Sequence, residues 1–161
     1  MVADRACAVI GWLSDLQQGQ PITVITRLRL DAALYDPAPE RQVGQRGRPR
    51  RKGNRLSTLA SLVHDSKTCC ERVRLQRWYG ETNREIEVIS QTAVWYHNGL
   101  PPLPLRWVSM RDPRGKFSTQ ALLCTDLLLS PIQILEYFVQ RWQLEITFEE
   151  VRAHLGVATQ R

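Results

Sequence analysis

The stretch that decides the fold is the C-terminal segment of residues 130–156, which reads SPIQILEYFVQRWQLEITFEEVRAHLG. Ser130 is a favoured helix N-cap, Pro131 suits the first helical position, and Gln133 stands at capping-box spacing from Ser130. Nothing after these residues breaks a helix until Gly156, a residue type that favours the position just past a helix end. The pattern predicts one long C-terminal helix.

Two stripes with different chemistry run along this helix. Polar and aromatic residues recur at steps of three, four and seven, so they lie near one stripe: Phe138, Arg141, Glu145 and Arg152. A second stripe is apolar and consists of Ile134, Leu135, Trp142 and Ile146. Two interpretations are open: a helix that buries one face and lines a site with the other, or a surface helix with an Arg141–Glu145 ion pair worth roughly a few tenths of a kcal/mol.

Upstream of the long helix, the pattern alternates between helix and strand. Helices are predicted over 6–18 and 56–63, and strands over 22–30, 84–96, 105–110 and 117–125. The sequence Asp112-Pro-Arg-Gly115 predicts a turn between the last two strands. The expected fold class is α/β, closed by the long C-terminal helix.

Length, composition and charge limit the possible classes of protein. A chain of 161 residues with 43% hydrophobic residues is long enough for one domain with a core and is not generally disordered. The net charge of +6 favours a polyanionic partner. The sequence contains neither an apolar run long enough for a membrane span nor a secretory signal pattern. Because the four cysteines form no Cys-x-x-Cys pair, we expect reduced thiols and a cytoplasmic protein.

The basic residues cluster in a stretch broken by glycine and proline. Between Arg41 and Arg55 there is no acidic residue, and the intervening basic residues are Arg46, Arg48, Arg50, Arg51 and Lys52. An exposed basic loop is therefore expected. Non-specific contact with phosphates, insertion into a DNA groove and a merely solvated loop all remain open, although Arg46-Gly-Arg-Pro-Arg50 resembles the core of an AT-hook.

Three tryptophans offer a second possible contact with nucleic acid. Trp78, Trp95 and Trp107 could each stack on an unpaired base near a cut. Packing in the core is the alternative for each of them.

The helix also resembles a known signature. The run from Phe138 to Arg152 is similar to the signature helix of insertion-sequence DDE transposases, Tyr-x2-Arg-x3-Glu-x6-Lys, in which Trp usually follows the Arg as Trp142 does here. Two positions depart from the signature, with Phe138 in place of Tyr and Arg152 in place of Lys. The charge is thus kept at position 152, whereas the phenolic hydroxyl is lost at position 138.

The N-terminal part resembles the same family. Val2-Ala-Asp4-Arg-Ala6 before a helix is similar to the second catalytic aspartate, which follows a strand, and Ile25–Arg29 resembles the next strand. The resemblance extends over essentially the whole chain. It implies a partial RNase H-like fold in which residues 1–161 are a single truncated catalytic domain, with a basic-loop and β-rich insertion over 36–126 and the signature helix over 130–155.

The resemblance also implies a chemistry. Asp4 and Glu145 would be catalytic and would bind Mg²⁺ (or Mn²⁺), because two hard cations held by carboxylates can activate the attacking water and stabilise the leaving oxygen. Transposon-end DNA with terminal inverted repeats would be the partner, contacted by Phe138, Arg141 and Arg152 and by the loop residues Arg46, Arg48, Arg50, Arg51 and Lys52. Related enzymes act as dimers on paired DNA ends, so the resemblance allows a homodimer, whereas the sequence leaves the oligomeric state open.

In the family, a third carboxylate lies on an earlier strand, upstream of the position of Met1. Because two carboxylates bind Mg²⁺ weakly, little or no cleavage is expected from this chain alone, and marginal stability is expected as well. Localisation at the bacterial nucleoid would follow from the resemblance. The alternatives are a non-catalytic remnant that binds DNA or associates with a transposase, and a structural protein whose charges are only solvated.

Overall fold

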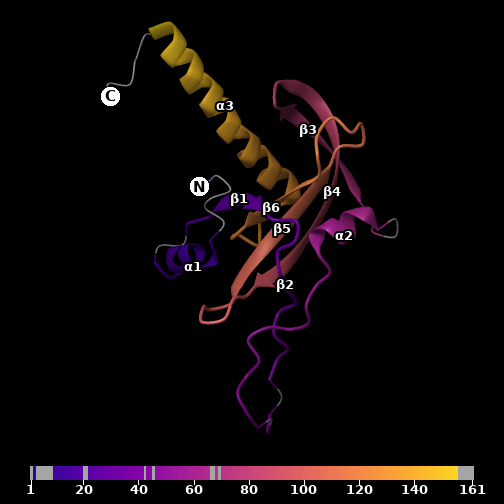
Figure 1. Ribbon diagram of the computed structural model, residues 1–161, viewed down its shortest axis with the longest axis vertical. Coiled ribbons are helices and arrows are strands. Elements are labelled where there is room, and N and C mark those ends of the chain that lie inside the picture. Colours follow the sequence, from indigo (N-terminus) through magenta and orange to yellow (C-terminus); the bar gives the residue numbers. More distant parts are fainter. Residues whose placement is uncertain are drawn as a thin grey trace.

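The computed structural model describes residues 2, 9–19, 22–41, 43–44, 46–65, 68 and 70–155, apart from the side chains of residues 64, 142–145, 149, 153 and 155. Within these residues the elements are α1 (Ile10–Gln18), β1 (Ile25–Leu28), β2 (Leu34–Tyr35), α2 (Leu59–His64), β3 (Glu71–Trp78), β4 (Glu81–Trp95), β5 (Leu103–Arg111), β6 (Gln120–Cys124) and α3 (Pro131–Leu155). The protein is a mixed α/β structure with a curled sheet and a long C-terminal helix, so the expected fold class is confirmed at this level (Figure 1).

The sheet is antiparallel between all its named strands. The strands lie in the order β1-β6-β5-β4-β2, and β3 also pairs with β4. Strand β4 has 15 residues, which lets it pair with β3 through its first half and with β5 from Glu87 to Trp95. Strands from the range 36–126 thus join β1 in one sheet.

One parallel contact stands out among the described residues. Val2 forms an isolated bridge with Ile25 of β1, and α1 lies between these two residues in the sequence. Parallel neighbours need a crossover connection, which is usually a helix. Val2, α1 and β1 therefore form the beginning of a β-α-β arrangement on the edge of β1 that faces away from β6.

Each face of the sheet has its own hydrophobic cluster, because successive side chains of a strand point to opposite faces. On one face, α3 contributes Ile134, Leu135, Phe138 and Val139 to a cluster that includes Leu122 of β6. On the other face, α1 and α2 contribute to a cluster that includes the next residue, Leu123, together with fully buried Trp107. Helices thus cover both faces of the sheet.

Helix α3 begins as the sequence predicts. The backbone N–H of Gln133 donates to Ser130 Oγ at 3.3 Å, and the backbone N–H of Ser130 donates to Gln133 Oε1 at 2.9 Å. This reciprocal pair is the predicted capping box, and it satisfies two of the amide groups that helix starts leave unpaired. Among the side chains of α3 that the structure describes, the buried ones lie in its first half, and Figure 1 shows its second half projecting beyond the sheet.

Two tight turns define the long hairpins of the sheet. Tyr79 and Gly80 connect β3 to β4, and both have positive φ (45° and 84°), as a two-residue type I′ turn requires. The predicted turn at Asp112–Gly115 is confirmed by the Gly115 N–H, which donates to the Asp112 carbonyl at 3.0 Å.

The other predicted elements exist with shifted ends, and two strands were not predicted. The strand expected over 22–30 is limited to Ile25–Leu28, and the strand expected over 84–96 begins at Glu81. Strand β3 was missed because only Val73 and Leu75 alternate clearly among its charged residues, while β2 has two residues, too few for any periodicity. Among the described residues, no helix is long and apolar enough to cross a membrane.

Candidate nucleic-acid interface

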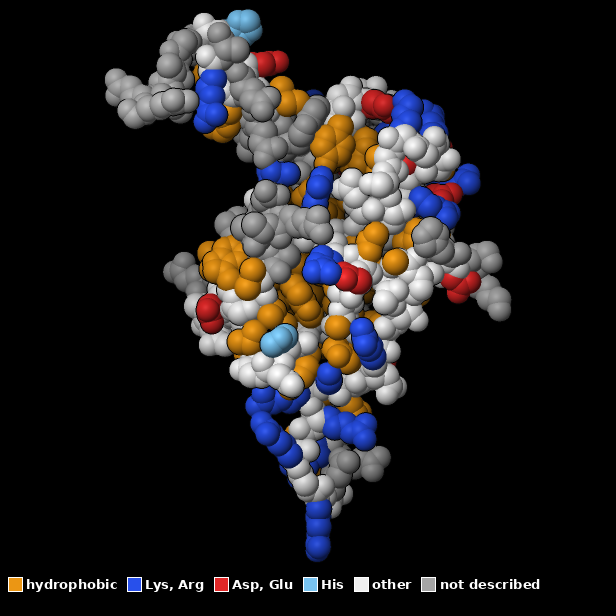
Figure 2. Space-filling model, in the orientation of Figure 1, with side chains coloured by type: hydrophobic (Ala, Val, Ile, Leu, Met, Phe, Trp, Pro, Cys, Tyr) orange, Lys and Arg blue, Asp and Glu red, His pale blue; other side chains and the backbone are white. Residues whose placement is uncertain are grey.

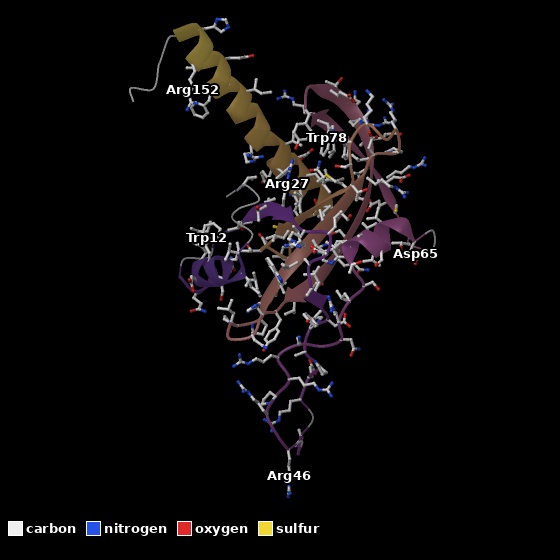
Figure 3. All side chains as sticks on the ribbon, in the orientation of Figure 1. Trp12, Arg27, Arg46, Asp65, Trp78 and Arg152 are labelled. Carbon is white, nitrogen blue, oxygen red and sulfur yellow. The ribbon has the colours of Figure 1, made fainter. Side chains whose placement is uncertain are left out.

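The residues of the signature helix occupy different environments. Phe138 was expected to contact DNA, but its side chain is only 1% exposed, because this turn of α3 packs on the sheet. The ring is therefore part of the core and supports its neighbours. Arg141, one turn further along, is half-buried and places its guanidinium 5.5 Å from the centre of the Phe138 ring. Arg152 is exposed on the projecting half of α3 (Figure 3).

A second guanidinium meets the same ring. Arg27 of β1 lies 5.7 Å from the Phe138 ring centre, and its Nε is buried with no hydrogen-bond partner among the described residues. Arg27 lies two residues after Ile25 in β1, so both side chains point to the same face of the sheet, the face that α3 covers. Sequence reasoning did not select Arg27, although this alternation was the available signal. The structure thus brings two cationic side chains, Arg27 and Arg141, to one aromatic ring where α3 crosses β1.

The two predicted catalytic carboxylates are only partly located. Asp4 lies outside the described residues, as does the side chain of Glu145, whose backbone belongs to α3. The nearest described neighbour of Asp4 in the sequence is Val2, which bridges to Ile25 and packs against the cluster that contains Phe138. Among the described residues, no three His, Cys, Asp or Glu side chains are grouped closely enough to hold a metal ion.

Basic side chains on the sheet are neutralised by acidic neighbours. Glu87 of β4 lies between Arg72 (3.3 Å) and Arg111 (2.6 Å), and Arg74 pairs with Glu85 at 2.7 Å. Cross-strand pairs of opposite charge stabilise antiparallel sheets modestly. Arg72, Arg74 and Arg111 therefore have intramolecular partners.

These pairs shift the acids toward their charged forms. The hydrogen bond from Arg111 lowers the pKa of Glu87, and the hydrogen bond from Arg74 lowers the pKa of Glu85. Glu81 has a lowered pKa chiefly because Lys116 hydrogen-bonds to it. Each of these carboxylates is consequently charged at neutral pH and occupied by a protein cation.

The basic loop, residues 36–54, projects from the sheet, and we call it the prong. Its two legs are the chain segments that lead to its tip and back to the sheet. Its legs are joined at the base by two backbone hydrogen bonds of 2.8 Å, from the Asp36 N–H to the Asn54 carbonyl and from the Gly53 N–H to the Asp36 carbonyl. A Cβ on Gly53 would lie 2.6 Å from the Pro37 carbonyl oxygen, so the close approach of the legs requires glycine there. Arg46 lies at the far tip (Figure 3).

Four arginines of the prong differ from the ion-paired arginines of the sheet, Arg72, Arg74 and Arg111. Arg46, Arg48, Arg50 and Arg51 are exposed, and the described part of the chain gives none of them an ion-pair partner. Figure 2 shows Lys and Arg side chains gathered over the prong with no acidic side chain among them on this face. A surface of this kind attracts phosphates.

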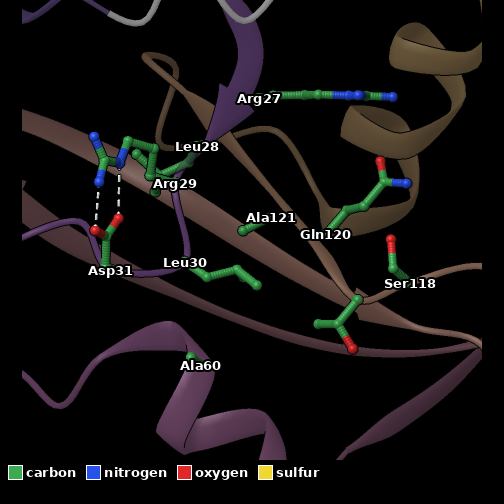
Figure 4. A pocket seen from close by; sticks show the side chains of 10 residues that line it. Arg27, Leu28, Arg29, Leu30, Asp31, Ala60, Ser118, Gln120 and Ala121 are labelled. Carbon is green, nitrogen blue, oxygen red and sulfur yellow. Dashed lines mark hydrogen bonds and ion pairs between the residues drawn. The ribbon is translucent and has the colours of Figure 1, made fainter.

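A solvent-open hollow lies at the end of β1. Its lining includes Arg27, the Arg29–Asp31 ion pair, Ser118 and Gln120, and its volume is about 450 Å³ (Figure 4). Arg27 extends over this hollow toward α3, on the same side as Gln120 (Figure 4). The hollow is therefore lined by polar groups, by Arg27 and by the Arg29–Asp31 ion pair.

The tryptophans do not form a stacking platform. Trp78 is 5% exposed and Trp107 is fully buried, while half-buried Trp95 packs against the core. Trp78 instead packs on Phe117, with ring centres 5.4 Å apart. The alternative of packing in the core is thus the one observed for these residues.

Comparisons with known proteins give no family assignment. No protein-family model matches the chain, and no curated protein matches it significantly. The functional argument accordingly rests on the residues and their geometry.

Proposed function

We propose that this chain is part of the catalytic domain of a DDE transposase with an RNase H-like fold. It binds transposon-end DNA and, in the complete enzyme, contributes Asp4 and Glu145 to the two-metal chemistry that cleaves and joins strands. The observation that carries the proposal is the contact of α3 with β1. Helix α3, which carries the transposase-like spacing, packs on β1. Ile25 of β1 also forms the parallel bridge with Val2, which lies two residues before Asp4.

Other features support the same assignment. The parallel Val2–Ile25 bridge with α1 between its partners is typical of the β-α-β part of an α/β domain. The antiparallel hairpins between β1 and α3 agree with a β-rich insertion between the second aspartate and the glutamate. Arg27 and Arg141 add positive charge at the start of the α3 segment that continues to Glu145.

A divalent metal fits the donor chemistry proposed for Asp4 and Glu145. Carboxylate oxygens are the ligands that Mg²⁺ and Mn²⁺ prefer. Among the described residues, no other group of three acidic, His or Cys side chains could hold a metal ion. The sheet carboxylates Glu85 and Glu87 form ion pairs with arginines instead. When bound, such a metal would stabilise charge on the attacking and leaving oxygens of a phosphodiester. Arg27 and Arg141 would hold the neighbouring phosphates in place.

DNA binding is tested by its dependence on salt. Each protein–phosphate contact adds about 0.9 to the magnitude of the negative slope of log K against log salt on duplex DNA. The variant R48A/R50A should therefore bind a duplex more weakly and with a slope reduced by about 1.8. Its matched control is R72A/R74A, which removes the same charge from two arginines that already have acidic partners. If the affinity of the unaltered protein for duplex DNA does not change with salt concentration, the proposed function is ruled out.

Strand cleavage requires a separate test. Purified chain incubated with labelled transposon-end DNA and Mg²⁺ or Mn²⁺ should nick it slowly or not at all, since the family places a third carboxylate on an earlier strand. Joining the chain to an upstream segment that ends a strand in aspartate should produce cleavage, and Glu145→Gln should abolish it. Strong nicking that survives Glu145→Gln would contradict the catalytic assignment.

A second candidate function is a DNA-binding or transposase-associating module without catalysis. The exposed prong favours it, because its arginines are available to phosphates whether or not a metal is present. Salt-dependent binding of DNA by the chain, with no cleavage by the joined protein, would support this candidate over the first.

A further inference from the structure

Lys52 differs from every other basic residue of the prong. Arg41, Arg46, Arg48, Arg50 and Arg51 are exposed, whereas Lys52 is half-buried at the base of the prong, beside Gly53. A basic side chain that contacts DNA phosphates needs an accessible charge. The position of Lys52 therefore argues for a role inside the protein.

The ammonium group of Lys52 is directed at two aromatic rings of the sheet. Its Nζ lies 3.5 Å from the centre of the Tyr35 ring and 4.6 Å from the centre of the Tyr96 ring. The two rings pack edge to face at 6.4 Å, so they form a corner that encloses the cation from two sides. Tyr35 belongs to β2 and Tyr96 follows β4, hence the contact joins the prong to the sheet.

The contact of Lys52 with the two tyrosines lies next to the backbone hydrogen bonds that join the two legs of the prong. Asp36 bonds to Gly53 and Asn54, and Tyr35 bridges Arg55, so the legs are paired up to Gly53. Lys52 is the next residue toward the tip. Beyond it, the cross-leg hydrogen bond among the described residues is from Arg41 Nη2 to the Gly47 carbonyl at 3.3 Å, near the tip. The contact of Lys52 with Tyr35 and Tyr96 therefore lies at the point from which the prong extends away from the sheet.

From this geometry we infer that Lys52 is a positioning residue, held by Tyr35 and Tyr96, that fixes the direction in which the prong presents its arginines to DNA. The inference rests on the proposed function for its DNA partner. It removes Lys52 from the set of residues expected to contact phosphates and assigns that contact to Arg46, Arg48, Arg50 and Arg51.

A tyrosine titration tests the contact without DNA. The hydrogen-bonding interaction with the Lys52 ammonium lowers the pKa of Tyr35 below its ordinary value of about 10. In the full chain, K52M should raise the pH at which one phenol ionises, followed by ultraviolet absorbance. In a Y35F background, K52M should leave the titration unchanged. A titration that K52M does not alter in the unmodified background would overturn the inference.

DNA binding tests the role. K52M should weaken binding of a duplex about three- to tenfold, and the slope of log K against log salt should stay unchanged, because no phosphate contact is lost. R50A is the matched control, since it removes one charge from an exposed site and should lower the slope by about 0.9. If K52M lowers the slope as R50A does, Lys52 contacts a phosphate and the inference is wrong.

The tyrosines complete the test. Y35L/Y96L should weaken binding as much as K52M does, and adding K52M to Y35L/Y96L should cause no further loss, because both changes remove one contact. Additive losses would contradict the inference. A thermal transition measured for each variant shows that the fold is intact. If the unaltered protein binds DNA without salt dependence, the proposed function fails, while the titration still decides whether the contact exists.

Discussion

Arg84 and Asp112 form the most buried ion pair among the described residues. Their side chains are 2% and 0% exposed, and Arg84 Nη2 lies 2.6 Å from Asp112 Oδ2. The backbone N–H groups of Arg114 and Lys116 also donate to the Asp112 carboxylate, at 2.9 and 2.7 Å. The pair thus fixes the β5–β6 turn. Arg84 Nη1 also lies 2.9 Å from Glu81 Oε2, but Glu81 is half exposed, so Asp112 supplies the buried negative charge beside Arg84.

We expect Asp112→Asn to lower the free energy of unfolding by about 3 kcal/mol or more. The amide keeps the shape of the side chain but removes the buried negative charge beside Arg84, whose other ion-pair partner, Glu81 at 2.9 Å, is 44% exposed. Urea denaturation at neutral pH measures the change. The control is Glu85→Gln, whose pair with Arg74 is largely exposed and should contribute about 1 kcal/mol or less. Equal effects of the two substitutions would contradict the importance of burial.

At the scale of elements, α3 and the turn at Asp112–Gly115 were readable from short stretches of sequence, because their signals are local. Ser130 and Gln133 form the capping box within one helical turn, and the residues Asp112 and Gly115 close a turn within four residues. Strand β3 was not readable in this way. Its identity depends on pairing with β4, which buries Val73 and Leu75 beneath α3.

Ser130→Ala should reduce the free energy of unfolding by about 1 kcal/mol, because the backbone N–H of Gln133 loses the Ser130 hydroxyl as its acceptor at the start of α3. Chemical denaturation followed by far-ultraviolet circular dichroism measures the loss. Ser118→Ala serves as the control, since Ser118 is exposed and lies outside any helix. A Ser130 variant as stable as the control would mean that the capping box does not stabilise α3.

For the molecule as a whole, most ion pairs among the described residues lie on or beside the sheet, whereas Arg46, Arg48, Arg50 and Arg51 of the prong have none. The carboxyl groups with lowered pKa values all lie on or beside the sheet: Glu81, Glu85, Glu87 and Asp112. For Asp112, burial raises the pKa, but the donors from Arg114, Lys116 and Arg84 outweigh it. The unfolded chain binds protons at these groups more readily than the folded protein does.

Stability should therefore be highest above the ordinary carboxyl pKa of about 4 and should fall as the pH drops below it. Denaturation midpoints measured between about pH 7 and pH 3 test this expectation. Asp112→Asn should flatten the acid limb, because one of the four groups no longer titrates. Stability that rises on acidification would show that these ion pairs do not favour the charged forms.

The sequence by itself determined the long helix with its cap, the turn at Asp112–Gly115, the basic loop and the α/β class. These depend on residues close together in the chain, where propensity and spacing are sufficient. The position of Arg27, by contrast, was visible only as an alternation in a short strand, with nothing in the sequence to show what it faces.

Only the tertiary structure decided which of these residues are accessible. Phe138 is buried with two guanidiniums near its ring, and the Lys52 ammonium lies against Tyr35 and Tyr96, because strands and helices distant in sequence pack together there. Pairing of β1 with β6 likewise joins residues about a hundred positions apart. The physical reason is that burial and ion pairing depend on which faces meet, and a local pattern shows only that a face exists.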